Sequence, residues 1–123
     1  MIDKRQKDKF ENLFNILENI LPIEPPAAVH GDLWSGNFIC NTDENAVFID
    51  PAVYYGHREI DVSMSMLFGG FSSIFYEEYQ EIYPMNPGFN ERKDIYNLYP
   101  LLIHLNLFGT SYKSSILRII DRF

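Results

Sequence analysis

The first part of the chain carries apolar residues at the spacing of a helix. Between Asp3 and Leu21 they recur every three or four positions, separated mostly by charged and polar residues. This spacing is typical of an amphipathic α-helix. Pro22 must end the helix because proline has no backbone N–H and clashes with the preceding turn. The pattern therefore predicts a leading helix within residues 1–21, with apolar positions Phe10, Leu13, Phe14, Leu17, Ile20 and Leu21.

The middle of the chain follows a different pattern. Two short apolar runs, residues 38–40 and 46–49, flank a stretch rich in turn-forming residues from Asn41 to Asn45. Apolar runs on either side of such a turn predict a β-hairpin. Cys40 has apolar neighbours in the first run, so we expect its side chain to be buried.

Beyond Pro51 the sequence returns to helical spacing. It predicts helices over residues 60–68, 72–83, 94–108 and 111–120, with Gly69 and Gly70 ending the first and Pro100 inside the third. The order of one helix, a hairpin and several more helices predicts an α+β fold that is mostly α-helical. A length of 123 residues suits a single domain.

Composition narrows the class of protein. Acidic residues outnumber basic ones by 17 to 10, which gives a formal net charge of −7. This charge argues against a nucleic-acid partner, because such a partner needs a basic surface. No apolar run approaches the ~18 residues of a membrane span, and the start of the chain has no apolar signal core. A single cysteine excludes an internal disulfide. We therefore expect a cytoplasmic protein without a membrane partner.

The residues best suited to chemistry surround the predicted hairpin. His30, Asp32 and Asn37 precede its first strand, and Asp50 follows its second. Because a hairpin brings its two ends together, we expect Asn37 and Asp50 to lie close in space. A carboxylate oxygen and an amide oxygen that face one point suit a hard cation such as Mg²⁺. The spacing H-x-D-x-x-x-x-N, with a further Asp after the hairpin, matches the template for phosphoryl transfer, in which Asp32 accepts a proton from a hydroxyl nucleophile.

Four stretches make this match more specific: HGDLWSGN, FIDPAVYYGHREIDVSM, LFGGF and LYPLLIHLNLFG. Through them the chain, from about residue 25 to about residue 115, resembles the fructosamine (ketosamine) kinase family. That family belongs to the aminoglycoside-phosphotransferase branch of the protein-kinase-like fold. The resemblance implies ATP as co-substrate, Mg²⁺ as cofactor, and transfer of the γ-phosphoryl group to the 3-hydroxyl of a ketosamine such as a glycated amine.

The resemblance also implies roles for individual residues. Asp32 is expected to be the catalytic base, and Asn37 and Asp50 are expected to bind Mg²⁺. His30 is expected to brace the loop beside Asp32, with a part in proton transfer as the alternative.

Five further residues near the motif admit structural as well as functional interpretations. Trp34 faces the sugar or fills the core, and Tyr55 lines the sugar pocket or simply packs. His57 and Arg58 contact the substrate or form an ion-paired surface turn. Asp61 is expected to be a structural residue near the site, which caps the following helix and bonds to the catalytic loop, with a part in the chemistry as the alternative.

One part of the family pattern is not found in this sequence. No three of its glycines fit the nucleotide-covering pattern G-x-G-x-x-G, and no lysine lies in a strand pattern before the loop. We therefore expect residues 1–123 to be the C-terminal, catalytic lobe of a kinase-like fold, with the N-terminal lobe absent. Such a chain is expected to have little or no kinase activity alone. It is also expected to self-associate through the apolar surface that the missing lobe leaves uncovered.

Two alternatives stay open. One is a kinase of the same branch that acts on another small-molecule hydroxyl, such as that of an aminoglycoside, choline or homoserine. The other is a non-catalytic binding module that keeps the fold. Trp34 and the GHREID run favour a ketosamine substrate. The presence of Asp32, Asn37 and Asp50 argues against a protein that lost its catalytic activity long ago.

Overall fold

The computed structural model describes residues 2–123, and the chain divides into two compact units. The first comprises the residues up to 23 together with residues 97–123, and the second comprises residues 24–96. Helix α4 (Phe89–Phe108) contributes residues to both. The assignment of residues 1–123 to one domain stays a prediction.

The first unit is built from helices. Helix α1 (Lys4–Ile20) begins with a capping box, in which the Asp3 carboxylate accepts from the backbone N–H of Gln6 and the Gln6 side chain accepts from that of Asp3. The short helix η2 (Thr110–Tyr112) leads into α5 (Lys113–Ile120), which packs against α1. Leu13 and Ile116 are among the buried residues of this unit. The predicted leading helix is confirmed.

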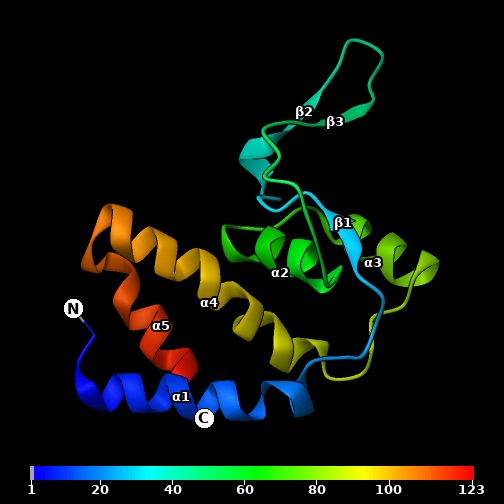
Figure 1. The fold of residues 1–123 in the computed structure, drawn as a ribbon. Helices are drawn as coiled ribbons and strands as arrows, with labels where there is room; N and C mark the ends of the chain where they lie inside the picture. Colours follow the sequence, from blue (N-terminus) through cyan, green and yellow to red (C-terminus); the bar gives the residue numbers. More distant parts are fainter. Residues whose placement is uncertain (1) are drawn as a thin grey trace. The chain divides into compact units, whose positions relative to one another are not determined.

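The second unit contains two small antiparallel sheets. Strands β2 (Phe38–Cys40) and β3 (Ala46–Phe48) form the predicted hairpin, which extends away from the helices of this unit (Figure 1). Strand β1 (Ala27–Val29) pairs with β4 (Tyr54–Gly56), so that Val29 is opposite Tyr54 and Ala27 is opposite Gly56. The sequence did not lead us to expect β4, although its aromatic residues favour a strand.

Helices complete this unit. Helix α2 (Glu59–Leu67) and helix α3 (Ser73–Ile82) correspond to two of the predicted helices, and α4 begins five residues before its predicted start. The short helix η1 (Ser35–Asn37) leads directly into β2. The predicted α+β, mostly helical fold is confirmed. Within residues 2–123, no helix is long and apolar enough to cross a membrane.

The expectation that Cys40 is buried is wrong. Its side chain is exposed, as are the other residues of β2. The reason is that β2 pairs only with β3, and the hairpin stands out from the helices (Figure 1). An apolar strand is buried only where another layer of structure covers its face.

Candidate active site

Two segments distant in sequence are joined at the base of the hairpin. The backbone N–H of Ile49 donates to the Asn37 carbonyl oxygen (2.9 Å), and that of Ala52 donates to the His30 carbonyl oxygen (2.8 Å). Their close approach explains the residue at position 31: a Cβ there would lie 2.1 Å from the Ala52 carbonyl oxygen, and φ is +84°. Gly31 meets both conditions because it has no Cβ. The loop of residues 30–37 is therefore fixed against residues 49–52.

The ring of His30 adds a further link between these segments. Its Nδ1 accepts from the backbone N–H of Asp32 at 3.2 Å, and its Nε2 lies 2.9 Å from the Ile49 carbonyl oxygen. Because Nδ1 accepts, Nε2 must carry the hydrogen that is donated to Ile49. One neutral tautomer satisfies both contacts. His30 thus holds the backbone of Asp32 in place through its ring.

Asp61 fixes the same loop from the first turn of α2. Its Oδ2 accepts from the backbone N–H of His30 at 2.7 Å, and its Oδ1 accepts from that of Gly31 at 3.0 Å. Both hydrogen bonds involve a carboxylate, which makes them stronger than bonds between neutral groups. Asp61 is therefore a structural residue that anchors the loop to a helix.

Asn37 is buried and directed at Asp32. Its side-chain Nδ2 donates to the Asp32 carbonyl oxygen at 2.9 Å and to the Asp32 carboxylate Oδ2 at 3.0 Å. Because the amide nitrogen makes both contacts, the amide oxygen Oδ1 points away from Asp32 and can accept from or coordinate another group. The two residues, five positions apart, form one polar unit.

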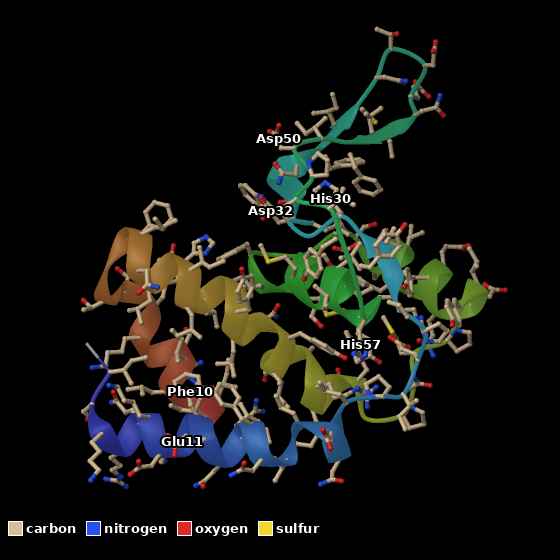
Figure 2. The ribbon with its side chains drawn as sticks, in the orientation of Figure 1. Phe10, Glu11, His30, Asp32, Asp50 and His57 are labelled. Carbon is tan, nitrogen blue, oxygen red and sulfur yellow. The ribbon has the colours of Figure 1, made fainter. Side chains whose placement is uncertain are left out.

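Asp50 lies at the same place but has an unusual backbone. It follows Ile49, so the hydrogen bonds made by Ile49 and Ala52 hold it beside the loop. Figure 2 shows Asp50, Asp32 and His30 together at the base of the hairpin. The φ of Asp50 is +49°, in the left-handed region, which Asp adopts more readily than most residues with a side chain.

Asp32, Asn37 and Asp50 together offer two carboxylates and one amide oxygen. Among residues 2–123 there is no group of three or more His, Cys, Asp or Glu side chains placed to hold a metal ion. Mg²⁺ binds through one or two carboxylates, keeps several waters and takes further oxygens from substrate phosphates. The donor set at the base of the hairpin fits that mode of binding.

Of the predicted substrate residues, Trp34 lies within this loop. It is the residue before η1, and 37% of its surface is exposed. Tyr55 is in the middle of β4, opposite Ala28, and is 76% exposed. Neither position fills the core, but the register places Tyr55 further from the loop than its neighbour Tyr54, which is opposite Val29. A role in substrate contact stays a prediction for both residues.

His57 and Arg58 lie at the other end of the β1–β4 pair from the loop. Figure 2 shows His57 well separated from His30, Asp32 and Asp50. The Arg58 guanidinium donates to the carbonyl oxygens of Tyr83 and Pro84 and forms an ion pair with Glu24 at 3.7 Å. The expected ion pairing is therefore present, but the residue is buried, so its place on the surface is wrong. The structure does not bring these two residues to the site, and we leave them out of the functional proposal.

Sequence reasoning also missed a buried ion pair between α2 and α4. Glu59, fully buried in α2, accepts two hydrogen bonds from Arg92 of α4, at 2.8 Å from Nε and 2.6 Å from Nη2. The hydrogen bond with Glu59 raises the pKa of Arg92, and burial raises the pKa of the neighbouring Tyr96. Arg92 also donates to the carbonyl oxygens of Asn86 and Pro87. Since Glu59 is two residues before Asp61, this pair fixes the part of α2 that anchors the loop.

Comparison with known proteins decides the family. The family model described as fructosamine kinase matches residues 3–123. The chain belongs to the fructosamine kinase family. A probable ketoamine kinase from Enterococcus faecium (strain ATCC BAA-472 / TX0016 / DO) is 44% identical over 121 residues, which are 98% of this chain and 44% of the relative. The chloroplastic protein-ribulosamine 3-kinase of Oryza sativa subsp. indica is 46% identical over 98% of this chain and 34% of the relative.

A solved structure of the family agrees with the fold. The crystal structure of a protein from Thermobifida fusca YX-ER1, assigned as a fructosamine-3-kinase, superposes with a TM-score of 0.86 at 35% identity. The match covers 97% of this chain and 42% of that one. The chain therefore spans from about a third to less than half of the length of the fructosamine kinase relatives described here.

Proposed function

We propose that this chain carries the phosphoryl-transfer site of an ATP-dependent kinase that phosphorylates a ketosamine of the fructosamine type. The observation that carries the proposal is the orientation of Asn37, whose amide nitrogen is held by Asp32 while its backbone is paired with Ile49, next to Asp50. This orientation leaves the Asn37 amide oxygen free of Asp32, and the closure of the hairpin brings Asn37 next to Asp50, which supports a role for the three residues in one site. The names of the relatives, ketoamine kinase and protein-ribulosamine 3-kinase, support a ketosamine as the acceptor.

Each residue of the site has a distinct task in this proposal. Asp32 accepts the proton of the acceptor hydroxyl, since a carboxylate held by hydrogen bonds is a suitable general base. Asn37 and Asp50 hold Mg²⁺, which neutralises phosphate charge when bound. His30 and Asp61 keep the backbone of the loop in place, and the work of catalysis is mainly positioning and electrostatic stabilisation.

Trp34 is proposed to contact the sugar of the acceptor. Its indole is partly exposed in the same loop as Asp32, so an apolar face is available beside the proposed base. Aromatic side chains combine a large apolar surface with a rigid shape, which suits the C–H face of a sugar ring. Recognition of the acceptor is thereby placed next to the atom that reacts.

A chimaeric enzyme provides the test. The segment of the Enterococcus faecium relative that matches this chain is replaced by residues 3–123 of the present sequence. We expect the chimaera to transfer phosphate from ATP to N-fructosyl-glycine in the presence of Mg²⁺, with release of ADP as the measured quantity. The unaltered relative is the positive control. The isolated chain is expected to show little turnover in the same assay, well below the ~1–100 s⁻¹ of typical kinases.

Assays of the chimaera with other acceptor compounds separate the alternative functions. Phosphorylation of an aminoglycoside, choline or homoserine in preference to the fructosyl compound contradicts the ketosamine assignment but keeps the kinase. A folded chimaera that binds Mg·ATP and phosphorylates none of these acceptors favours the non-catalytic binding module. Assignment to the C-terminal lobe, self-association and a cytoplasmic location stay predictions.

A further inference from the structure

The segment that follows α2 touches the candidate site with two aromatic rings. The ring of Phe68 meets the indole of Trp34 edge-on, with centroids 6.3 Å apart and an interplanar angle of 75°. The ring of Phe71 meets that of Phe38 in the same manner, at 6.0 Å and 69°. Trp34 and Phe38 immediately precede and follow η1, the short helix that ends at Asn37. The residues on both sides of η1 are therefore in contact with the segment of residues 68–71.

The indole of Trp34 also packs against the backbone at Gly36. A Cβ at Gly36 would lie 2.2–2.6 Å from three carbon atoms of the indole, so the ring lies directly over this glycine. The absence of a side chain at Gly36 lets the indole approach the backbone of η1 closely. Contacts with Gly36 and with the ring of Phe68 therefore restrict the position of the indole. The residue is still 37% exposed.

The segment of residues 68–71 is itself held in place by Tyr76 of α3. The Ser65 hydroxyl donates to the Val62 carbonyl oxygen at 2.7 Å, so its oxygen is an acceptor for the Tyr76 hydroxyl at 3.0 Å. The Tyr76 oxygen in turn accepts from the backbone N–H of Phe71 at 3.0 Å. This chain of hydrogen bonds uses each hydroxyl once as donor and once as acceptor. It holds the turn between α2 and α3 at one position.

We propose that Phe68 is a positioning residue for Trp34 and, through it, determines the affinity of the site for the acceptor sugar. This inference rests on the proposed function, which places the sugar on Trp34. An edge-to-face aromatic pair defines the relative orientation of its two rings and contributes beyond the area that it buries. Without the ring at position 68, the indole gains freedom, and the sugar-binding surface loses its shape.

The position of the indole can be measured in the 123-residue chain without any ligand. Trp34 is the single tryptophan, so its emission reports only on this site. In Phe68→Leu we expect a red shift of the emission and a higher acrylamide quenching constant, because leucine lacks the ring edge. Phe68→Tyr keeps the ring and is expected to match the parent. Phe14→Leu is the matched control, since it makes the same change at an exposed ring that contacts Phe10 and lies outside the segment that contacts Trp34.

The functional consequence is measured by titration with N-fructosyl-glycine, followed by Trp34 emission. Phe68→Leu is expected to weaken binding of this compound about 2- to 10-fold, the range expected for one aromatic pair. Phe68→Tyr is expected to restore the parent affinity. Calorimetry with Mg·ATP is expected to give the same result for Phe68→Leu and the parent, because the residue acts through the sugar-binding surface.

The outcomes separate this inference from the proposed function. If Phe68→Leu leaves the emission and quenching of Trp34 unchanged, or if Phe14→Leu changes them equally, Phe68 does not position the indole. If the emission changes as expected but the parent does not respond to the fructosyl compound, the sugar-binding role of Trp34 is wrong, whereas the acceptor assignment stands or falls with the chimaera assay. If Phe68→Leu weakens Mg·ATP binding as much as sugar binding, the effect is a general disturbance of the loop and the inference is overturned.

Discussion

Replacing Asp32 by asparagine is expected to slow phosphoryl transfer by the chimaera about 10²–10⁴-fold, the contribution of a general base. The substitution keeps the size of the side chain and an oxygen that can accept from Asn37 Nδ2, and the backbone oxygen of residue 32 still accepts from the same group. The loop is thus expected to keep its shape while it loses the proton acceptor. The loss is expected in kcat, and the dissociation constant of N-fructosyl-glycine is expected to stay close to that of the parent chimaera.

A matched control lies in the same hairpin. Asp43 is exposed in the turn between β2 and β3, so Asp43→Asn makes the same change in charge without touching the site. We expect this variant to retain the activity of the parent chimaera. An Asp32→Asn variant with activity within a few-fold of the Asp43→Asn control would show that Asp32 is a turn residue and that the proton is accepted elsewhere.

Replacing Arg92 by methionine is expected to destabilise the chain by about 3–5 kcal/mol, because it leaves the carboxylate of Glu59 buried without its partner. Glu59 is 0% exposed, and Arg92 supplies both of its hydrogen bonds to that carboxylate from one guanidinium. The change also removes the donors to the carbonyl oxygens of Asn86 and Pro87. The effect is measured as the free energy of unfolding by urea denaturation, monitored by circular dichroism.

The neighbouring residue of α4 gives the control for this change. Lys93 is partly exposed and donates to the Asn90 side chain at 3.5 Å, so Lys93→Met removes a cation without leaving a buried charge. Its effect is expected to be within about 0.5 kcal/mol, the usual range for surface substitutions. The double variant Glu59→Leu with Arg92→Met is expected to be more stable than Arg92→Met alone, since no buried charge remains. A loss no larger than that of Lys93→Met would mean that the pair does not hold α2 in place.

Local patterns were sufficient to predict the hairpin and the grouping of residues around it. The turn residues from Asn41 to Asn45 lie between two apolar runs, and a hairpin is closed by residues that are adjacent in sequence. The proximity of Asp50 to Asn37 follows from that closure. The contact of Asp61 with the backbone of His30 and Gly31 spans about 30 positions, and periodicity alone does not predict it.

The buried charges could not be predicted from the sequence for a related reason. Arg58 and Glu59 stand beside His57 in a charged run that looks like a surface turn, yet both are buried. Charged groups are buried only when partners satisfy them. The partners here are Glu24 and the carbonyl oxygens of residues 83 and 84 for Arg58, and Arg92 for Glu59, between 25 and 34 positions away. Nothing in the local pattern indicates these pairings.

The central claim is that Asn37 and Asp50 hold one divalent cation with a nucleotide beside Asp32. Titration of the ¹⁵N-labelled chain with Mn²⁺ and ATP tests this directly, because Mn²⁺ prefers the same oxygen ligands as Mg²⁺ and broadens NMR signals close to it. The account predicts broadening that is strongest in residues 30–38 and 49–52 and weaker in the residues that contact this loop, Asp61 and residues 68–71. It predicts loss of that broadening in Asn37→Ala and no change in Asn45→Ala, an exposed residue of the same hairpin. Broadening centred elsewhere in the chain, or unchanged by Asn37→Ala, would contradict it.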